Sequence, residues 1–194
     1  MKILNLYCGI GGNRKRWGDE HEITAVEIDK DIAAIYQEIF PNDKVIITDA
    51  HDYLLEHYKE FDFIWSSPPC PSHSRLRCCN PKQNKPIFPD MKLYEEIIFL
   101  QKWFKGKFIV ENVNSYYKPL IEPFLIERHY FWSNIILKDI YFKGIIDVRR
   151  GIIPDMEKAL NYNLSKYKGI DKRAILRNCV NPKVGLHIFK EMLK

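Results

Sequence analysis

One cysteine lies between two prolines at the end of an apolar segment, in the sequence Trp-Ser-Ser-Pro-Pro-Cys-Pro-Ser-His-Ser at residues 65–74. Proline fixes its own φ and restricts the residue before it, so Pro69 and Pro71 limit the backbone of Cys70 from both sides. A cysteine that only fills a core, the common alternative, does not need this restraint. The sequence therefore predicts a thiol that is held in one direction, as a nucleophile requires.

A second candidate for chemistry is Glu111, which directly follows the apolar residues Phe108-Ile109-Val110. A carboxylate after a buried strand is costly unless it is paired or functional. An acid beside a thiolate can protonate the group that the thiolate attacks. We therefore expect Cys70 and Glu111 to act together.

Three further features could bind a cofactor: the glycine turn Cys8-Gly9-Ile10-Gly11-Gly12, Glu27 and Asp49. A glycine turn between a strand and a helix lets a ligand approach the backbone, although this one is shorter than the dinucleotide fingerprint. Glu27 ends a strand and suits a ribose diol, and Asp49 could accept a hydrogen bond from an exocyclic amine. For Glu27 alone, a surface carboxylate is the alternative. Together the three predict a nucleoside cofactor without a pyrophosphate.

Short apolar strands that alternate with helices must position these residues. The expected strands are 3–7, 22–28, 44–48, 61–65 and 107–110, and the expected helices are 30–40, 50–58, 91–104, 154–162 and 181–193. This alternation predicts an α/β fold with a largely parallel sheet. Ligands of such sheets bind beyond the carboxyl ends of the strands, where the candidate residues fall. Residues 75–89 form a proline-broken loop, and loops of this length are often functional.

The composition limits the class of protein. The 194 residues, 46% of them hydrophobic, fit one folded domain. No apolar run of about 18 residues suggests a membrane span, and the N-terminus does not resemble a signal peptide, so we expect a cytoplasmic protein. The five cysteines form neither a disulfide framework nor a zinc motif, so we expect no metal, and Cys78 and Cys79 are interpreted as ordinary thiols.

The positive charge is concentrated in one part of the chain. The formal charge is +5, but residues 143–183 hold ten Lys or Arg and four Asp or Glu, a balance of +6. A basic segment on a near-neutral body suggests a polyanion partner, with a solvated surface as the alternative.

Four motifs, in order along nearly the whole chain, resemble those of the 5-cytosine DNA methyltransferase family. Asn5-Leu6-Tyr7-Cys8-Gly9-Ile10-Gly11-Gly12 is similar to the family's Asp-Leu-Phe-x-Gly-x-Gly-Gly, Pro68-Pro69-Cys70 to its Pro-Cys nucleophile, Glu111-Asn112-Val113 to its Glu-Asn-Val, and Arg177-Asn178-Cys179-Val180 to its Gly-Asn-x-Val. Each match is short, but the ordered set is specific.

The resemblance implies a Rossmann-like class I S-adenosylmethionine-dependent methyltransferase fold, with a mostly parallel sheet and helices on both faces. It implies methyl transfer from S-adenosyl-L-methionine to carbon 5 of a flipped-out cytosine, leaving S-adenosyl-L-homocysteine. Cys70 would attack carbon 6, Glu111 would stabilise protonation at ring nitrogen 3, and Arg128 is the candidate for the base carbonyl oxygen. The implied cofactor-binding residues are Tyr7, Gly9, Gly11, Glu27, Ile28, Asp49, Pro69, Asn178 and Val180.

The chain departs from the family pattern in three short stretches. Pro71-Ser72-His73-Ser74 replaces Gln-Gly-Phe-Ser after the nucleophile. Family members carry an Arg-x-Arg pair in a late strand, of which only the second arginine, Arg128, is present. Arg177 replaces the glycine of the last motif.

The resemblance also divides the chain into a catalytic and cofactor-binding core (1–134), a short basic target-recognition region (135–174) and a C-terminal motif and helix (175–194). The candidate contacts to nucleic acid are Ser74, Arg75, Arg77, Arg149, Arg150, Lys172 and Arg173. For each arginine, a solvated surface role is the alternative. The short recognition region predicts a short target or loose specificity.

The implied partner is duplex DNA, bound by a monomer of a bacterial or phage-encoded enzyme. A cognate restriction enzyme or a second subunit could accompany it. Two alternatives stay open: methylation of tRNA, which some relatives of this family carry out, and a non-catalytic copy that only binds nucleic acid. An intact set of Cys70, Glu111 and Glu27 argues against the second.

Overall fold

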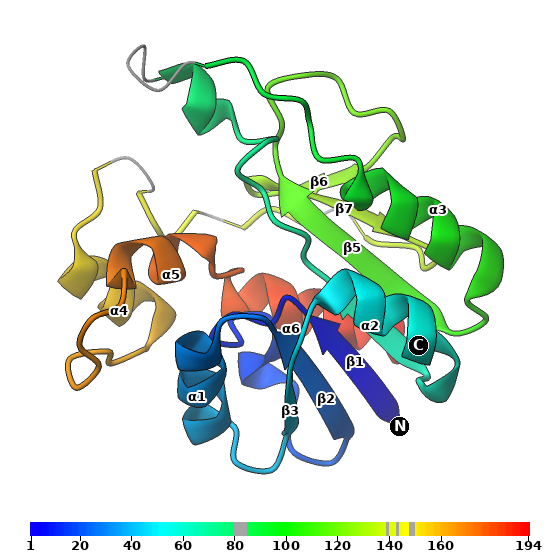
Figure 1. Ribbon diagram of the computed structural model, residues 1–194, viewed down its shortest axis with the longest axis horizontal. Helices are drawn as coiled ribbons and strands as arrows, with labels where there is room; N and C mark the ends of the chain where they lie inside the picture. The colour runs from blue at the N-terminus through cyan, green and yellow to red at the C-terminus, as the bar shows by residue number, and fades with distance from the viewer. Residues whose placement is uncertain (80–84, 139, 143, 148–149) are drawn as a thin grey trace.

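A seven-stranded sheet in the order β3-β2-β1-β4-β5-β7-β6 forms the centre of the protein in the computed structural model (Figure 1). The structure describes residues 1–79, 85–138, 140–142, 144–147 and 150–194. The strands are β1 Lys2–Leu6, β2 Glu22–Glu27, β3 Lys44–Ile47, β4 Phe63–Ser66, β5 Lys107–Val113, β6 Phe124–Ile126 and β7 His129–Ser133. The first five strands are parallel, and β7 pairs antiparallel with both β5 and β6. The expected mostly parallel sheet is confirmed.

Helices cover both faces of the sheet, because successive side chains of a strand point to opposite faces. In β1, Ile3 packs in a core with α6 (Pro182–Met192). Leu4 packs in the opposite core with α2 (Ala50–His57) and α3 (Lys92–Trp103). Helix α1 (Lys30–Ile39) packs through Tyr36 on Ala25 of β2. The class I methyltransferase architecture that the sequence implied is therefore present.

Helices α1 and α2 begin directly after strands, at aspartates that cap them. The side chain of Asp29 accepts hydrogen bonds from the backbone of Asp31 and Ile32, and Asp49 accepts from His51 and Asp52. Such caps satisfy backbone N–H groups that have no partner in the first turn of a helix. Both helices therefore start at the edge of the sheet where the parallel strands end.

Three elements differ from the sequence-based expectations. The glycine turn leads into a single 3-10 turn, η1 (Arg14–Arg16), which was not among the expected elements. A short helix, α5 (Lys172–Asn178), was not expected. Strands β6 and β7 form a hairpin whose two-residue turn holds Arg128, which therefore does not lie in a strand. Glu127, the other turn residue, has a φ of 56°, as tight hairpin turns require.

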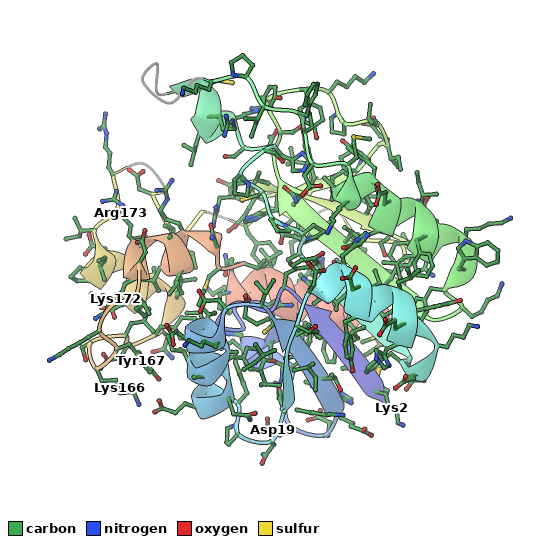
Figure 2. The ribbon with its side chains drawn as sticks, in the orientation of Figure 1. Lys2, Asp19, Lys166, Tyr167, Lys172 and Arg173 are labelled. Carbon is green, nitrogen blue, oxygen red and sulfur yellow. The ribbon has the colours of Figure 1, made fainter. Side chains whose placement is uncertain are left out.

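Helices α4 (Ile153–Leu160) and α5 lie together beside α1 (Figure 1). Ile10 of the glycine turn packs in one apolar cluster with residues of both helices, and the hydroxyl of Tyr162 donates to the Ile10 carbonyl at 3.1 Å. Lys15 donates to the carbonyl of Leu160 at 3.1 Å. The loop before α5 is tied to α1, because Lys166 and Tyr167 both contact Glu38 (Figure 2). These contacts place the late part of the chain over the glycine turn.

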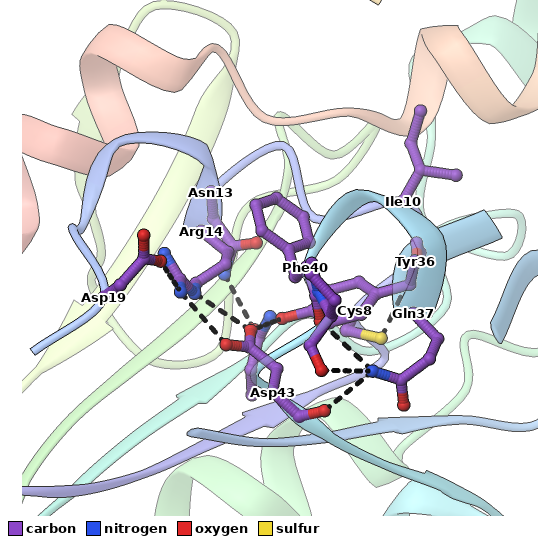
Figure 3. A network of polar contacts seen from close by, with 12 residues as sticks. Cys8, Ile10, Asn13, Arg14, Asp19, Tyr36, Gln37, Phe40 and Asp43 are labelled. Carbon is purple, nitrogen blue, oxygen red and sulfur yellow. Dashed lines mark hydrogen bonds and ion pairs between the residues drawn. The ribbon is translucent and has the colours of Figure 1, made fainter. Parts of the chain in front are cut away.

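A buried polar network around Asp43 packs next to the glycine turn (Figure 3). Arg14 of η1 donates two hydrogen bonds to Asp43, at 2.9 and 3.0 Å, although both side chains are almost fully buried. The hydroxyl of Tyr36 donates to the same carboxylate at 2.8 Å. The network thus joins η1, α1 and the start of β3 beneath the residues that could contact a ligand.

Within the parts of the chain that the structure describes, no helix has both the length and the apolar character needed to cross a membrane.

Candidate active site

A cavity of about 550 Å³ opens at the carboxyl ends of β1, β2, β4 and β5, the edge of the sheet where a ligand was expected. Its volume is in the range of small-molecule sites. The segment 169–180, which includes α5, forms the opposite wall. The predicted residues that line the cavity are Tyr7, Gly9, Glu27, Ile28, Pro69, Cys70, Ser74, Glu111, Arg128, Asn178 and Val180.

Cys70 lies in the proline segment that follows β4, and this half-buried residue is held by hydrogen bonds on both sides of it. The carbonyl of Pro68 accepts from Nδ2 of Asn112 at 2.9 Å, which fixes the proline segment against β5. The carbonyl of Cys70 accepts from the backbone of His73 and Ser74, both at 3.0 Å. Burial and then Glu111 raise the pKa of the Cys70 thiol, whereas Arg128 and Arg177 lower it. The thiol therefore needs a cation or a base near it to react as a thiolate.

Glu111 is part of β5 and is almost fully buried in the same cavity. Burial raises its pKa from 4.5 to about 7, against the opposing effects of a hydrogen bond from Ser67 and of Arg128. A carboxyl group with this pKa is present in both protonation states at neutral pH, so it can give or take a proton.

His129 is a residue of this site that the sequence-based argument missed. Its Nε2 lies 3.5 Å from Oε1 of Glu111, because His129 is the residue of β7 opposite Val113 in the sheet register. Burial and then Arg128 hold the pKa of His129 well below its usual range, so the ring is neutral. No local sequence pattern indicated it, because β7 is not among the expected strands.

Arg128 joins the hairpin turn to the end of α5. Its guanidinium donates to the carbonyl of Arg177 at 3.0 Å and to that of Cys179 at 3.2 Å. A guanidinium carries five N–H donors, so others remain for a ligand in the cavity. Arg177 also lines the cavity, although in the sequence it was notable only as a departure from a motif.

The glycine turn and Glu27 form the half of the cavity that suits a nucleoside. Glu27 accepts from the backbone of Gly9 at 3.0 Å and of Asp29 at 3.1 Å, one bond to each carboxylate oxygen. Each oxygen keeps a lone pair for a hydroxyl group. A Cβ at Gly9 would meet no atom within 4 Å, and Ile28 is 66% exposed beside it. This arrangement leaves room for a ribose on the carboxylate and offers an apolar side chain to a base.

Tyr7 is fixed in the cavity wall by a buried carboxylate. Its hydroxyl donates to Oε1 of Glu96 at 2.6 Å, and Oε2 of Glu96 accepts from Ser66 at 2.5 Å. Nδ1 of His51 lies 3.0 Å from the same Oε1, and this contact raises the pKa of His51. Glu96 was also missed; a glutamate on the apolar face of the expected helix 91–104 was the signal for it.

Two predicted cofactor residues do not line the cavity. Gly11 has a φ of 75°, and a Cβ there would lie 2.9 Å from the ring of Tyr36, so glycine is required by packing on α1. Asp49 uses Oδ1 to cap α2, at 2.8 Å from the backbone N of His51.

The predicted nucleic-acid contacts are spread over two regions. Arg77 lines a smaller hollow next to Cys70, and Nε of Arg75 donates to the carbonyl of Ser115 at 2.9 Å. Lys172 and Arg173 lie on α5 (Figure 2), and Arg150 is exposed. Arg149 lies outside the described residues.

No group of three or more His, Cys, Asp or Glu side chains that could hold a metal ion occurs in the described ranges of the chain.

Comparison with known proteins gives a family match in sequence and structural matches that include the following two. A model of the family described as C-5 cytosine-specific DNA methylase matches residues 1–119, more than half of the chain. The Spodoptera frugiperda DNMT2 structure, an E260A/E261A/K263A mutant, is similar with a TM-score of 0.63 and 15% identity, over 100% of this chain and 99% of that one. The Entamoeba histolytica methyltransferase EhMeth has a TM-score of 0.59 and 10% identity, over 100% and 98%. None of the curated proteins compared with the chain matches it in sequence.

Proposed function

The chain belongs to the C-5 cytosine-specific DNA methylase family, and from this we propose that it transfers a methyl group from S-adenosyl-L-methionine to carbon 5 of cytosine in DNA. The observation that supports this proposal most directly is that Cys70, Glu111 and Arg128 line the same cavity as Tyr7 and Glu27. A base and a nucleoside cofactor could therefore meet inside one cavity.

The residues of the cofactor half fit S-adenosylmethionine, which when bound supplies an electrophilic methyl group. Glu27 would accept from the two ribose hydroxyls, and the open backbone at Gly9 would allow close approach. The Tyr7 ring and Ile28 would contact the apolar parts of the adenosine. No pyrophosphate is involved, which agrees with a glycine turn that lacks a helix behind it.

In the base half, the thiolate of Cys70 would attack carbon 6 of cytosine. Glu111 would donate its proton to ring nitrogen 3, so that the electron pair of the former 5,6 double bond makes carbon 5 nucleophilic. Arg128 would donate a hydrogen bond to the carbonyl oxygen of the base. After carbon 5 is methylated, solvent water would take the proton of carbon 5, which restores the 5,6 double bond and expels the Cys70 thiolate, while nitrogen 3 returns its proton to Glu111.

The pKa of Glu111, about 7, suits this proton transfer, because efficient acid catalysts have a pKa near the working pH. Neutral His129 beside it adds no second positive charge that would force Glu111 to ionise.

We propose duplex DNA as the substrate, with the cytosine flipped out of the helix to reach the cavity. In the same proposal the protein acts as a monomer and recognises its target through the short region 135–174. A restriction enzyme or a second subunit could accompany it. If RNA and not DNA is methylated, the substrate changes but the proposed reaction at carbon 5 of cytosine stays the same.

Covalent trapping tests the proposal. The protein is mixed with S-adenosylmethionine and duplex DNA in which cytosine is replaced by 5-fluorocytosine, and the adduct is resolved on a denaturing gel. Carbon 5 cannot lose fluorine as it loses a proton, so we expect a stable adduct with the wild type and none with Cys70→Ala. The control Cys78→Ala, at an exposed cysteine, should keep it. An adduct on a fluorinated tRNA transcript alone would reassign the substrate to RNA, and no adduct on either would refute the proposed reaction.

A further inference from the structure

A second hollow, of about 300 Å³, adjoins the cavity at the nucleophile. Its lining residues are Cys70, Pro71, Ser74, Leu76, Arg77, Ala174, Arg177 and Asn178, and all of them except Arg77 also line the larger cavity. The hollow is therefore an outward continuation of the active site. It runs between η3 (Arg75–Cys79), which follows the nucleophile, and α5.

Two arginines face this hollow from its two walls. Arg77, half-buried, comes from η3 and donates to the carbonyl of Lys85 at 2.8 Å. Arg177, also half-buried, comes from the last turn of α5. None of the eight lining residues is acidic. Two guanidinium groups without a carboxylate among them favour an anion, and the planar guanidinium fork matches a phosphate in particular.

The backbone of Arg177 is held in place by the active site itself. Its carbonyl accepts from Arg128 at 3.0 Å, so the residue cannot move away from the cavity without breaking that bond. A basic residue in the last turn of a helix also complements the helix dipole, which alone would explain an arginine on any face. The position of Arg177 is more specific than that, because its side chain lines both hollows. From there its positive charge lowers the pKa of the Cys70 thiol.

We propose that this smaller hollow binds the phosphodiester group of the target nucleotide, with Arg177 and Arg77 as its ligands. The inference rests on the proposed function and adds the path of the strand to it. With the phosphate held outside, the base extends inward over Cys70 and towards Arg128 and Glu111. The family's Arg-x-Arg pair has a first arginine two residues before Arg128, and this chain lacks it. Arg177, at the position where the family motif has glycine, then supplies the second cation in its place.

A double-mutant cycle on the protein and the nucleic acid tests this directly. The substrate is the sequence context in which trapping occurs, with the phosphate on one side of 5-fluorocytosine replaced by an uncharged methylphosphonate. The quantity measured is the nucleic-acid concentration that gives half-maximal adduct. For the wild type we expect the methylphosphonate at one of the two flanking positions to raise it about tenfold, equivalent to about 1.4 kcal/mol.

Arg177→Gln should weaken the normal substrate by a similar factor and should lose the response to the methylphosphonate. Arg177→Lys should recover part of both effects, because it restores the charge and not the fork. Arg16→Gln, at an exposed arginine that lines neither hollow, should behave as the wild type. Binding of S-adenosylmethionine, measured by equilibrium dialysis, should be unchanged in all variants.

The outcomes separate the two proposals. If the wild type forms an adduct but the effects of Arg177→Gln and of either methylphosphonate simply add, the phosphate contact is refuted and the proposed reaction stands. If the wild type forms no adduct on DNA or RNA, the proposed function fails and the inference fails with it.

Discussion

Replacement of Glu111 by glutamine should make the protein more stable at alkaline pH and abolish its activity. In the folded protein, burial raises the pKa of Glu111 from 4.5 to about 7. The folded state therefore holds this proton more tightly than the unfolded state does. As pH rises from 4.5 to 7, the unfolded chain has already lost the proton and the folded chain has not, so the free energy of unfolding falls through this window and stays low above it.

The size of the effect follows from the shift, at about 1.4 kcal/mol per pKa unit. The full shift corresponds to about 3 kcal/mol of stability lost at pH 8, and about 1 kcal/mol at pH 5. Glutamine has nearly the shape of the protonated carboxyl group and does not ionise. Glu111→Gln should therefore exceed the wild type in stability by about 3 kcal/mol at pH 8 and by about 1 kcal/mol at pH 5.

Urea denaturation at the two pH values measures this difference. At a slope of about 2 kcal/mol/M, the midpoint at pH 8 should rise by about 1.5 M. Glu122→Gln, at an exposed carboxyl group, should shift neither midpoint. The reasoning is refuted if Glu111→Gln is no more stable than the wild type at pH 8, or if its advantage is the same at both pH values. The same variant should form no adduct, because the amide of glutamine is not acidic enough to transfer a proton to ring nitrogen 3.

Two other contacts make separate predictions. Arg14→Met leaves the buried carboxylate of Asp43 without its charged partner, so it should lower the free energy of unfolding by about 3–5 kcal/mol in urea denaturation. The control Arg16→Met, at an exposed arginine, should change the free energy of unfolding by less than about 0.5 kcal/mol. Equal losses in the two variants would mean that the ion pair does not stabilise the fold. Tyr117→Phe removes the hydroxyl that lies 2.5 Å from Nδ1 of His73. It should lower the free energy of unfolding by about 1–3 kcal/mol and slow adduct formation at Cys70. An unchanged rate would show that the backbone hydrogen bonds alone hold the segment from Cys70 to Ser74.

The regular strands and longer helices could be predicted because their apolar residues repeat with a clear period. No expected boundary of these elements differs from the structure by more than three residues. The β6–β7 hairpin carried no such signal. Its turn is Glu127-Arg128 instead of a glycine or asparagine pair, although Glu127 still adopts a left-handed backbone. Helix α5 has seven residues, too few for an apolar period to be recognised.

The site could be predicted in part for a related reason. Cys70 and Glu111 each stand next to a local signal, a proline pair or a buried strand. His129 and Arg177 reach the cavity only because a hairpin and a short helix fold back on the sheet, which no local pattern indicates. Asp49 is a different case: an aspartate between a strand and a helix was interpreted as a ligand, and in the structure its Oδ1 caps the helix, so its contact with a cofactor stays a prediction.

Segments distant in the sequence close the cavity, and two close contacts hold them together. A Cβ at Gly12 would lie 2.7 Å from the carbonyl oxygen of Val180, so the glycine turn and the last motif touch through backbone atoms. On the other side, Arg128 binds the carbonyls at the end of α5. The cofactor half and the base half therefore share one wall, residues 177–180. A change that shifts the backbone of this wall should affect both halves at once, whereas a change of one side chain need not, and the shared backbone explains why a glycine turn near the start of the chain and a short motif near its end belong to one site.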